Sequence, residues 1–134
     1  MAENTSFRNG VTLGWVLSAI VILALAADAA VDLFAPSLIS AQMEETGFPA
    51  SLATAVGLII LVCVVLYAIP RTAVLGAILT TGFFGGAICA HFRLGEIGSP
   101  PQLISLLLGV VAWGGLYLRD ERVRRLLPFR SVSG

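Results

Sequence analysis

The chain lacks lysine entirely, contains a single histidine, and carries charged side chains at only 12% of its 134 positions. Soluble domains average about a quarter charged residues, so this composition excludes an ordinary soluble domain. The sequence also lacks the phosphate-binding G-x-x-x-x-G-K motif, the G-x-S-x-G motif of serine hydrolases and the H-E-x-x-H motif of zinc proteases. With one histidine the chain cannot complete a haem or zinc site alone, and we expect neither cofactor.

Cysteine is scarce too, and the two cysteines do not form a C-x-x-C motif. Cys63 lies near one end of the second apolar run, whereas Cys89 lies near the opposite end of the third. A rise of about 1.5 Å per residue separates them by about 18 Å in depth, whereas a disulfide needs alpha carbons within about 7 Å. We therefore expect two free thiols that pack as small apolar side chains.

What the chain has in abundance is apolar sequence. Its hydrophobic fraction is 57% and its mean hydropathy is +0.95. Four nearly charge-free runs each reach or approach the roughly 20 residues that a helix needs to cross about 30 Å of hydrocarbon. We expect an all-α, transmembrane four-helix bundle that forms a single membrane domain over residues 1–134. The expected spans are about 11–34, 50–69, 72–92 and 101–118, followed by a basic cytoplasmic tail at 119–134.

The distribution of arginine gives the expected orientation, since short loops rich in lysine or arginine stay in the cytoplasm. Four spans place both termini on one side, and seven of the eight arginines then share that side, with Arg93 alone on the other. We therefore expect an N-in/C-in, multi-pass protein of the plasma (inner) membrane. Four aromatic residues lie toward the arginine-rich ends, where we expect their rings among the headgroups: Trp15, Tyr67, Trp113 and Tyr117.

The first span has a second interpretation, because Ala24-Leu25-Ala26 and Ala27-Asp28-Ala29 resemble the small-residue sites at which signal peptides are cleaved. Cleavage would leave three spans and the same cytoplasmic C-terminus, so the arginine pattern fits both interpretations. We favour the uncleaved span, because its apolar run is longer than a usual signal core.

Small residues recur at helical spacing in every span, where they let helix backbones approach one another. The pairs are Gly14 with Ser18, Ala53 with Gly57, Gly82 with Gly86, and Ser105 with Gly109. We expect them to pack the spans of one chain together, with a homodimer seam as the alternative. The connection at 68–72 is so short that the second and third spans must form an antiparallel hairpin.

Ionisable residues gather at the end of the spans opposite most of the arginines. Asp28 and Asp32 are four residues apart and so share one face of the first span. His91 and Arg93 end the third span at a similar depth. Charged groups at membrane depth are costly unless paired, so we expect a carboxylate of the first span to pair with His91 or Arg93. The alternative is a proton-handling or quinone-binding pocket built from these four residues.

The C-terminal segment is basic, with five arginines after the last apolar run: Arg119, Arg122, Arg124, Arg125 and Arg130. We expect it to extend the last helix along the cytoplasmic surface as a membrane anchor, since each basic residue near anionic headgroups contributes about 1 kcal/mol. A protein-docking site is the alternative. Glu121 and Arg125 are spaced to form an ion pair on this helix.

Several blocks of the sequence, taken together, resemble the DoxX-like family of small bacterial four-helix membrane proteins. They are a first span that ends in acidic residues, 47–53 (GFPASLA), 69–79 (IPRTAVLGAIL), 90–95 (AHFRLG) and 113–120 (WGGLYLRD). The resemblance implies a membrane protein associated with redox complexes or with the assembly of other membrane proteins. Three polar positions common in that family differ here: Ile60 replaces a glutamate, Ala90 a threonine, and Ser99-Pro100-Pro101-Gln102 stands where a histidine opens the fourth span.

Those replacements remove polar side chains that are common in the family. We therefore expect a non-catalytic subunit, scaffold or assembly factor of a membrane complex and assign no catalytic residue. The alternative is a quinone-linked membrane oxidoreductase component that uses the cluster of Asp28, Asp32, His91 and Arg93. A quinone is the one cofactor that the resemblance leaves open. The expected partners are the lipid bilayer and either other membrane proteins or further copies of the chain, and nucleic acid is not expected.

Overall fold

The computed structural model describes residues 2–127, with side chains from residue 8 onward, and this part of the chain contains helices and no strands. Its long helices are α1 (Ala2–Phe34), α3 (Ala53–Ala68), α4 (Ala73–Arg93) and α5 (Pro100–Arg119). Four segments are long and apolar enough to cross a membrane: Arg8–Phe34, Ala50–Ala68, Ala73–Arg93 and Pro100–Arg119. The predicted all-α bundle with four spans is confirmed, with boundaries shifted by at most a few residues.

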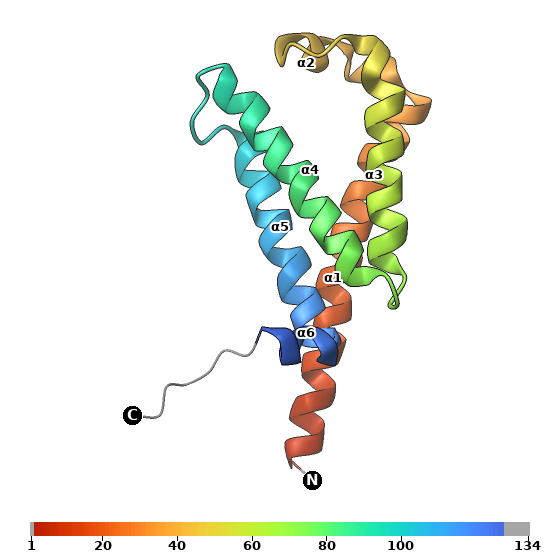
Figure 1. Ribbon diagram of the computed structural model, residues 1–134, viewed down its shortest axis with the longest axis vertical. Coiled ribbons are helices and arrows are strands. Elements are labelled where there is room, and N and C mark those ends of the chain that lie inside the picture. The colour runs from red at the N-terminus through yellow and green to blue at the C-terminus, as the bar shows by residue number, and fades with distance from the viewer. Residues whose placement is uncertain (1, 128–134) are drawn as a thin grey trace.

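The four long helices form a ring in which α1 contacts α3 and α5, and α4 contacts the same two helices. α1 and α4 therefore lie diagonally across the ring. Figure 1 shows all four helices close together near the short helix α6 (Glu121–Leu126), and α4 and α5 diverging from α1 and α3 toward α2 (Ser40–Glu45). We call these the basic end and the loop end of the bundle. The start of α1 lies at the basic end, as α6 does.

The core concentrates toward the basic end, where the bundle is closed. Fully buried side chains there come from every long helix and from α6, and they include Val21, Tyr67, Ala77, Leu116 and Val123. Burying such aliphatic and aromatic side chains stabilises the bundle in detergent and excludes water between its helices. The loop end, where the helix pairs separate, has fewer buried side chains.

Two of the predicted small-residue pairs bring helices together within the chain. A Cβ atom on Gly14 would lie 2.8 Å from the Gly115 carbonyl oxygen, and one on Gly57 would lie 2.8 Å from Asp32 Cβ. Close approach of α1 to α5 and of α1 to α3 therefore depends on the missing side chains. The prediction is wrong for Gly82 and Gly86, because a Cβ atom on either would meet nothing within 4 Å.

The α3–α4 connection is the predicted tight hairpin. Thr72 Oγ1 donates a hydrogen bond to the Leu66 carbonyl oxygen at 2.9 Å, which closes the turn. Gly76, one turn into α4, lies directly against the backbone of Leu66 and Tyr67. The backbones of α3 and α4 therefore touch where the hairpin begins.

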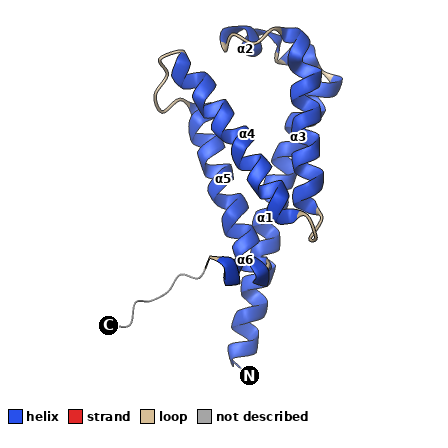
Figure 2. Ribbon diagram, viewed as in Figure 1, coloured by secondary structure: helices blue, strands red, loops and turns tan. Residues whose placement is uncertain are grey.

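Short helices occupy the ends of the bundle, and Figure 2 shows that irregular segments are confined to those ends. The segment between α1 and α3 contains η1 (Pro36–Leu38) and α2, which the sequence did not predict, and η2 (Ala50–Leu52), which falls within the predicted second span. The expected continuous extension of the last span is wrong. Asp120 is extended (φ −116°, ψ 111°), so α5 ends at Arg119, and the Asp120 side chain accepts a hydrogen bond from the Arg122 amide to start α6 as a separate helix.

Candidate functional site

The two carboxylates of α1 sit in different surroundings although they are one helical turn apart. Asp32 is only 4% exposed and lies beside Gly57 of α3. Asp28 is exposed. It precedes Phe34, the last residue of α1, by six residues, so it lies about 9 Å along the axis from the helix end. Asp28 is therefore an uncovered carboxylate within a membrane span.

Neither carboxylate has a partner in the described part of the chain. The ion pairs there join His91 to Glu96, Arg122 to Asp120, and Arg125 to Glu121. No hydrogen bond reaches the carboxylate oxygens of Asp28 or Asp32 from the described residues. Both carboxylates belong to α1, and no basic or hydrogen-bonding group of the described bundle compensates their charge.

His91 lies in the last turn of α4 and holds the α4–α5 loop. Its Nδ1 atom lies 2.6 Å from Glu96 Oε2, and this hydrogen bond lowers the pKa of the Glu96 carboxyl below its ordinary value. Gln102 holds the same loop, because its Oε1 atom accepts hydrogen bonds from the amides of Gly98 and Ser99. The sequence did contain the signal for Gln102, since Ser99-Pro100-Pro101-Gln102 has the S-x-x-Q spacing of a helix capping box.

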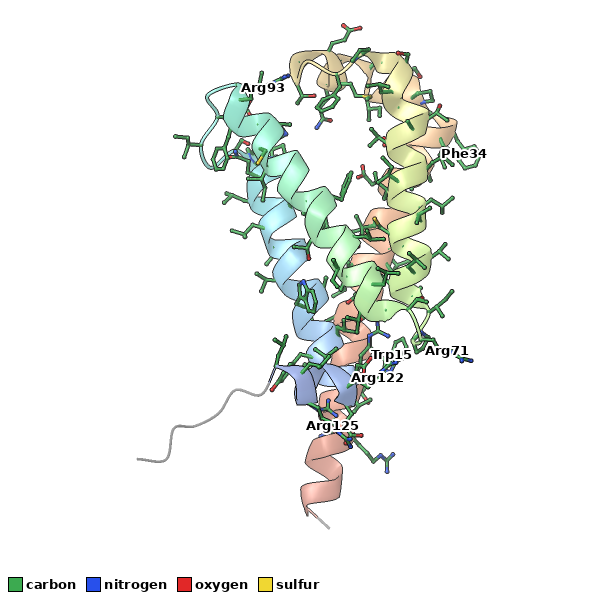
Figure 3. The ribbon with its side chains drawn as sticks, viewed as in Figure 1. Trp15, Phe34, Arg71, Arg93, Arg122 and Arg125 are labelled. Carbon is green, nitrogen blue, oxygen red and sulfur yellow. The ribbon has the colours of Figure 1, made fainter. Side chains whose placement is uncertain are left out.

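Arg93 fastens the end of α4 to the segment that follows α2. Its Nη2 atom donates a hydrogen bond to the Thr46 carbonyl oxygen at 2.9 Å. The next residue, Gly47, has φ +77°, and a side chain there would collide with the guanidinium group of Arg93. Figure 3 shows Arg93 at the loop end, pointing toward the α2 segment.

The predicted pairing of Asp28 or Asp32 with His91 or Arg93 is therefore wrong. The two basic residues have other partners, Glu96 and the Thr46 carbonyl group. Sequence spacing predicted only an approximate height for each group along the bundle. It did not give the order of helices around the ring, in which α1 and α4 are diagonal and diverge toward this end.

A second polar arrangement, which the sequence did not predict, lies at the basic end. The hydroxyl group of Tyr67, fully buried, donates a hydrogen bond to the Ala112 carbonyl oxygen at 2.7 Å and lies 3.1 Å from Ser18 Oγ. The guanidinium group of Arg119 lies 4.3 Å from the Trp15 ring centroid, and its Nη2 atom donates to the Tyr67 carbonyl oxygen at 3.0 Å. Tyr67 thus belongs to the core, which corrects its predicted place among the headgroups.

Arg122 of α6 contacts both the residue that caps its own helix and the α3–α4 turn. Arg122 forms an ion pair with Asp120 at 2.9 Å and donates to the Pro70 carbonyl oxygen at 2.6 Å, so α6 is tied to the α3–α4 turn. The hydrogen bond from Arg122 lowers the pKa of the Asp120 carboxyl. Figure 3 shows Arg122 and Arg71 close to one another at this end.

The other two described arginines of the C-terminal segment, Arg124 and Arg125, also lie on α6. Arg124 donates hydrogen bonds to the carbonyl oxygens of Tyr117 and Leu118 near the end of α5. Arg125 forms the predicted ion pair with Glu121, at 2.7 Å. Arg130 lies outside the described residues. A membrane-anchoring role for these arginines stays a prediction, to which the structure adds that Arg119, Arg122 and Arg124 also hold the basic end together.

A groove of about 610 Å³ runs along the outside of α4 and α5 and ends at α6. Trp113 Nε1 donates to Thr81 Oγ1 at 2.8 Å across its floor. Both cysteines are free, as predicted, but Cys89 is exposed where the sequence predicted a packed thiol, and Cys63 is buried. Among the described residues, no three His, Cys, Asp or Glu side chains gather closely enough to hold a metal ion.

Comparison with protein families gives one match, to the DoxX-like family, over residues 16–115. Comparisons with curated proteins and with solved structures give no match. The matched region contains the four residues of the predicted cluster and the Tyr67 hydroxyl group with both of its hydrogen-bond partners, and it stops before Arg119 and α6. Four apolar helices and a family match over most of its length identify the chain as a multi-pass membrane protein that belongs to the DoxX-like family.

Proposed function

We propose that the chain is a non-catalytic subunit or assembly factor of a membrane protein complex, and that a transmembrane helix of its partner docks at Asp28. The observation that carries this proposal is the exposed carboxylate of Asp28 within a membrane span. Ionisable groups at membrane depth are costly and normally face a partner or a water-filled space. A lysine, arginine or hydroxyl side chain on a second helix would satisfy Asp28 where its own bundle does not.

The surroundings of Asp28 suit a helix partner. Ala24 precedes Asp28 by one turn on the same face of α1, and small residues at such spacing let a second helix come close. The cationic side chains at the loop end cannot serve instead, because Arg93 holds the Thr46 carbonyl group and His91 holds Glu96. The charge at Asp28 is therefore available to another protein.

The quinone-linked alternative has less geometric support. Proton transfer to a quinone needs a donor or acceptor within hydrogen-bond reach of the ligand, and a second group commonly orients that donor. Here His91 is oriented by Glu96 in the α4–α5 loop, and neither α1 carboxylate contacts it. The absence of a direct contact between these groups in the described chain therefore favours the scaffold proposal.

Position-specific photo-crosslinking in native membranes tests the proposal. A photoreactive residue at Ala27, which is exposed beside Asp28, should give a discrete crosslinked membrane protein, and Asp28→Leu should abolish it. The same residue at Leu61, exposed on α3, is the control and should crosslink only lipid. Equal protein crosslinking from both positions, or a bound quinone that Asp28→Asn removes from the purified protein, would argue against a scaffold role.

A further inference from the structure

The groove along α4 and α5 has the length of one lipid leaflet. Ser105 and Tyr117 of α5 both line it, and the twelve residue steps from one to the other span about 18 Å of helix. Half of a roughly 30 Å hydrocarbon core is about 15 Å. A single extended acyl chain therefore matches the groove in length.

The groove owes its depth to glycines on both of its walls. A Cβ atom on Gly85 of α4 or on Gly114 of α5 would meet nothing within 4 Å, and one on Gly109 would touch only Phe84, at 3.7 Å. An empty apolar hollow forfeits dispersion contacts, so an apolar occupant is favoured over none. In a bilayer the hydrocarbon chain of a lipid is the apolar group at hand.

Two polar side chains of the groove, those of Trp113 and Thr81, already have hydrogen-bond partners within the chain. Trp113 Nε1 donates to Thr81 Oγ1, and the Thr81 hydroxyl donates in turn to the Ala77 carbonyl oxygen at 2.8 Å. These side chains therefore present an aromatic face and a methyl group to the occupant and need no hydrogen bond from it. A hydrocarbon chain fits this surface better than a polar ligand does.

The end of the groove at α6 is positively charged. Val123 of α6 and Leu127, the residue that follows this helix, line it, and Arg124 and Arg125 of α6 lie between them in the sequence. Residues 119–127 carry four arginines against two acidic residues, Asp120 and Glu121. Basic residues at a membrane surface attract anionic headgroups. We propose that the groove holds one acyl chain of an anionic phospholipid whose phosphate group lies against the arginines of α6.

Filling the groove with a larger side chain tests whether the acyl chain binds there. The full chain is purified in mild detergent, and retained phosphatidylglycerol and phosphatidylcholine of equal chain length are measured by native mass spectrometry. Gly85→Leu and Gly114→Leu, one on each wall, should each lower phosphatidylglycerol retention at least tenfold. Gly82→Leu is the matched control, since Gly82 lies on α4, is equally open and does not line the groove, and it should retain lipid as the native chain does.

Neutralising an arginine tests the headgroup. Arg125→Gln should weaken phosphatidylglycerol retention several-fold, whereas Arg71→Gln, at the α3–α4 turn of the same end, should not change it. Phosphatidylcholine retained as strongly as phosphatidylglycerol would overturn the proposal. Loss of phosphatidylglycerol from Gly82→Leu to the same extent as from the wall variants would overturn it too. A dimer of the native chain that Gly85→Leu dissociates would overturn it, because a second copy would then fill the groove. Inorganic phosphate that stabilises the chain as strongly as phosphatidylglycerol does would also overturn it. Because the two wall variants lie on different helices, misfolding of one leaves the other as the test.

Discussion

A single hydroxyl group illustrates how specific packing arises in an apolar bundle. In a membrane, helix association depends on van der Waals packing and on occasional hydrogen bonds between helices, because lipid tails are as apolar as leucine. The hydroxyl group of Tyr67 joins α3 to the Ala112 carbonyl group of α5 and lies within hydrogen-bond distance of Ser18 on α1. It thereby fixes the relative height of three helices that could otherwise slide past one another.

Tyr67→Phe should lower the free energy of unfolding in detergent by about 1 kcal/mol, because the Ala112 carbonyl group and the Ser18 hydroxyl group both lose a partner. Combining it with Ser18→Ala in a double-mutant cycle should give a coupling of at least a few tenths of a kcal/mol. The pair Tyr67→Phe and Thr81→Ala, which share no contact in the hydrogen-bond pattern, is the control and should be additive. Additivity for both pairs would mean that Ser18 and Tyr67 do not interact.

Glu96 gives the α4–α5 loop a dependence on pH. Its pKa lies below the ordinary value of 4.5, so folding favours the carboxylate form. The stabilisation is fully present above the ordinary pKa and is lost as the pH falls through the lower folded-state pKa. Hydrogen exchange at 94–98 should therefore accelerate, beyond its intrinsic pH dependence, below about pH 4.5. Glu96→Gln should be insensitive over this range, and identical profiles for both proteins would show that His91 and Glu96 do not pair.

The glycines of helix α4 have different structural roles. Gly76 lets α4 touch the backbone of α3, Gly85 forms a wall of the groove along α4 and α5, and Gly82 faces open space. Sequence spacing assigned Gly82 to packing, because it shows which residues share a face of the helix. It does not show whether another helix covers that face.

Substitutions at two of these glycines should have opposite signs. Gly76→Ala places a Cβ atom against the backbone of Tyr67, which cannot move aside, so we expect a loss of at least about 2 kcal/mol of unfolding free energy or failure to fold. Gly82→Ala meets nothing and should be neutral or stabilising by up to about 1 kcal/mol, because alanine is the better helix former. Thermal unfolding of both variants in one detergent provides the measurement. Equal effects would contradict the observed packing of α4.

The long elements were predictable and the short ones were not. Hydrophobic runs of about 20 residues locate the spans, because the thickness of the bilayer sets their length. The segment that contains α2 has no comparable hydrophobic run. The break between α5 and α6 depends on the cap at Asp120, and the same sequence is also compatible with a continuing helix. For the candidate site, the sequence identified Asp28 and placed it at the correct end, but it paired the wrong helices.

At the scale of the whole molecule, the structure places the start of α1 and helix α6 at one end of the bundle, as four crossings require (Figure 1). The arginine distribution predicts that this end is cytoplasmic. Reporter fusions near residue 1 and after residue 134 should therefore both read cytoplasmic, and an insertion after Glu45 should read external. An external reading at the C-terminus would contradict the predicted orientation, although the order of the helices around the ring would stand.

Asp28 is exposed on α1, and our account of the function rests on what covers it. The most direct measurement is the mass of the native assembly, solubilised in mild detergent, for the native chain, Asp28→Leu and the control Glu44→Gln in the exposed α2 segment. We predict a heteromeric complex for the native chain and Glu44→Gln. Asp28→Leu should give the free bundle, with thermal stability unchanged or raised because an unpaired carboxylate has been removed. A complex of unchanged mass with Asp28→Leu, or a bundle that unfolds without Asp28, would contradict a docking role.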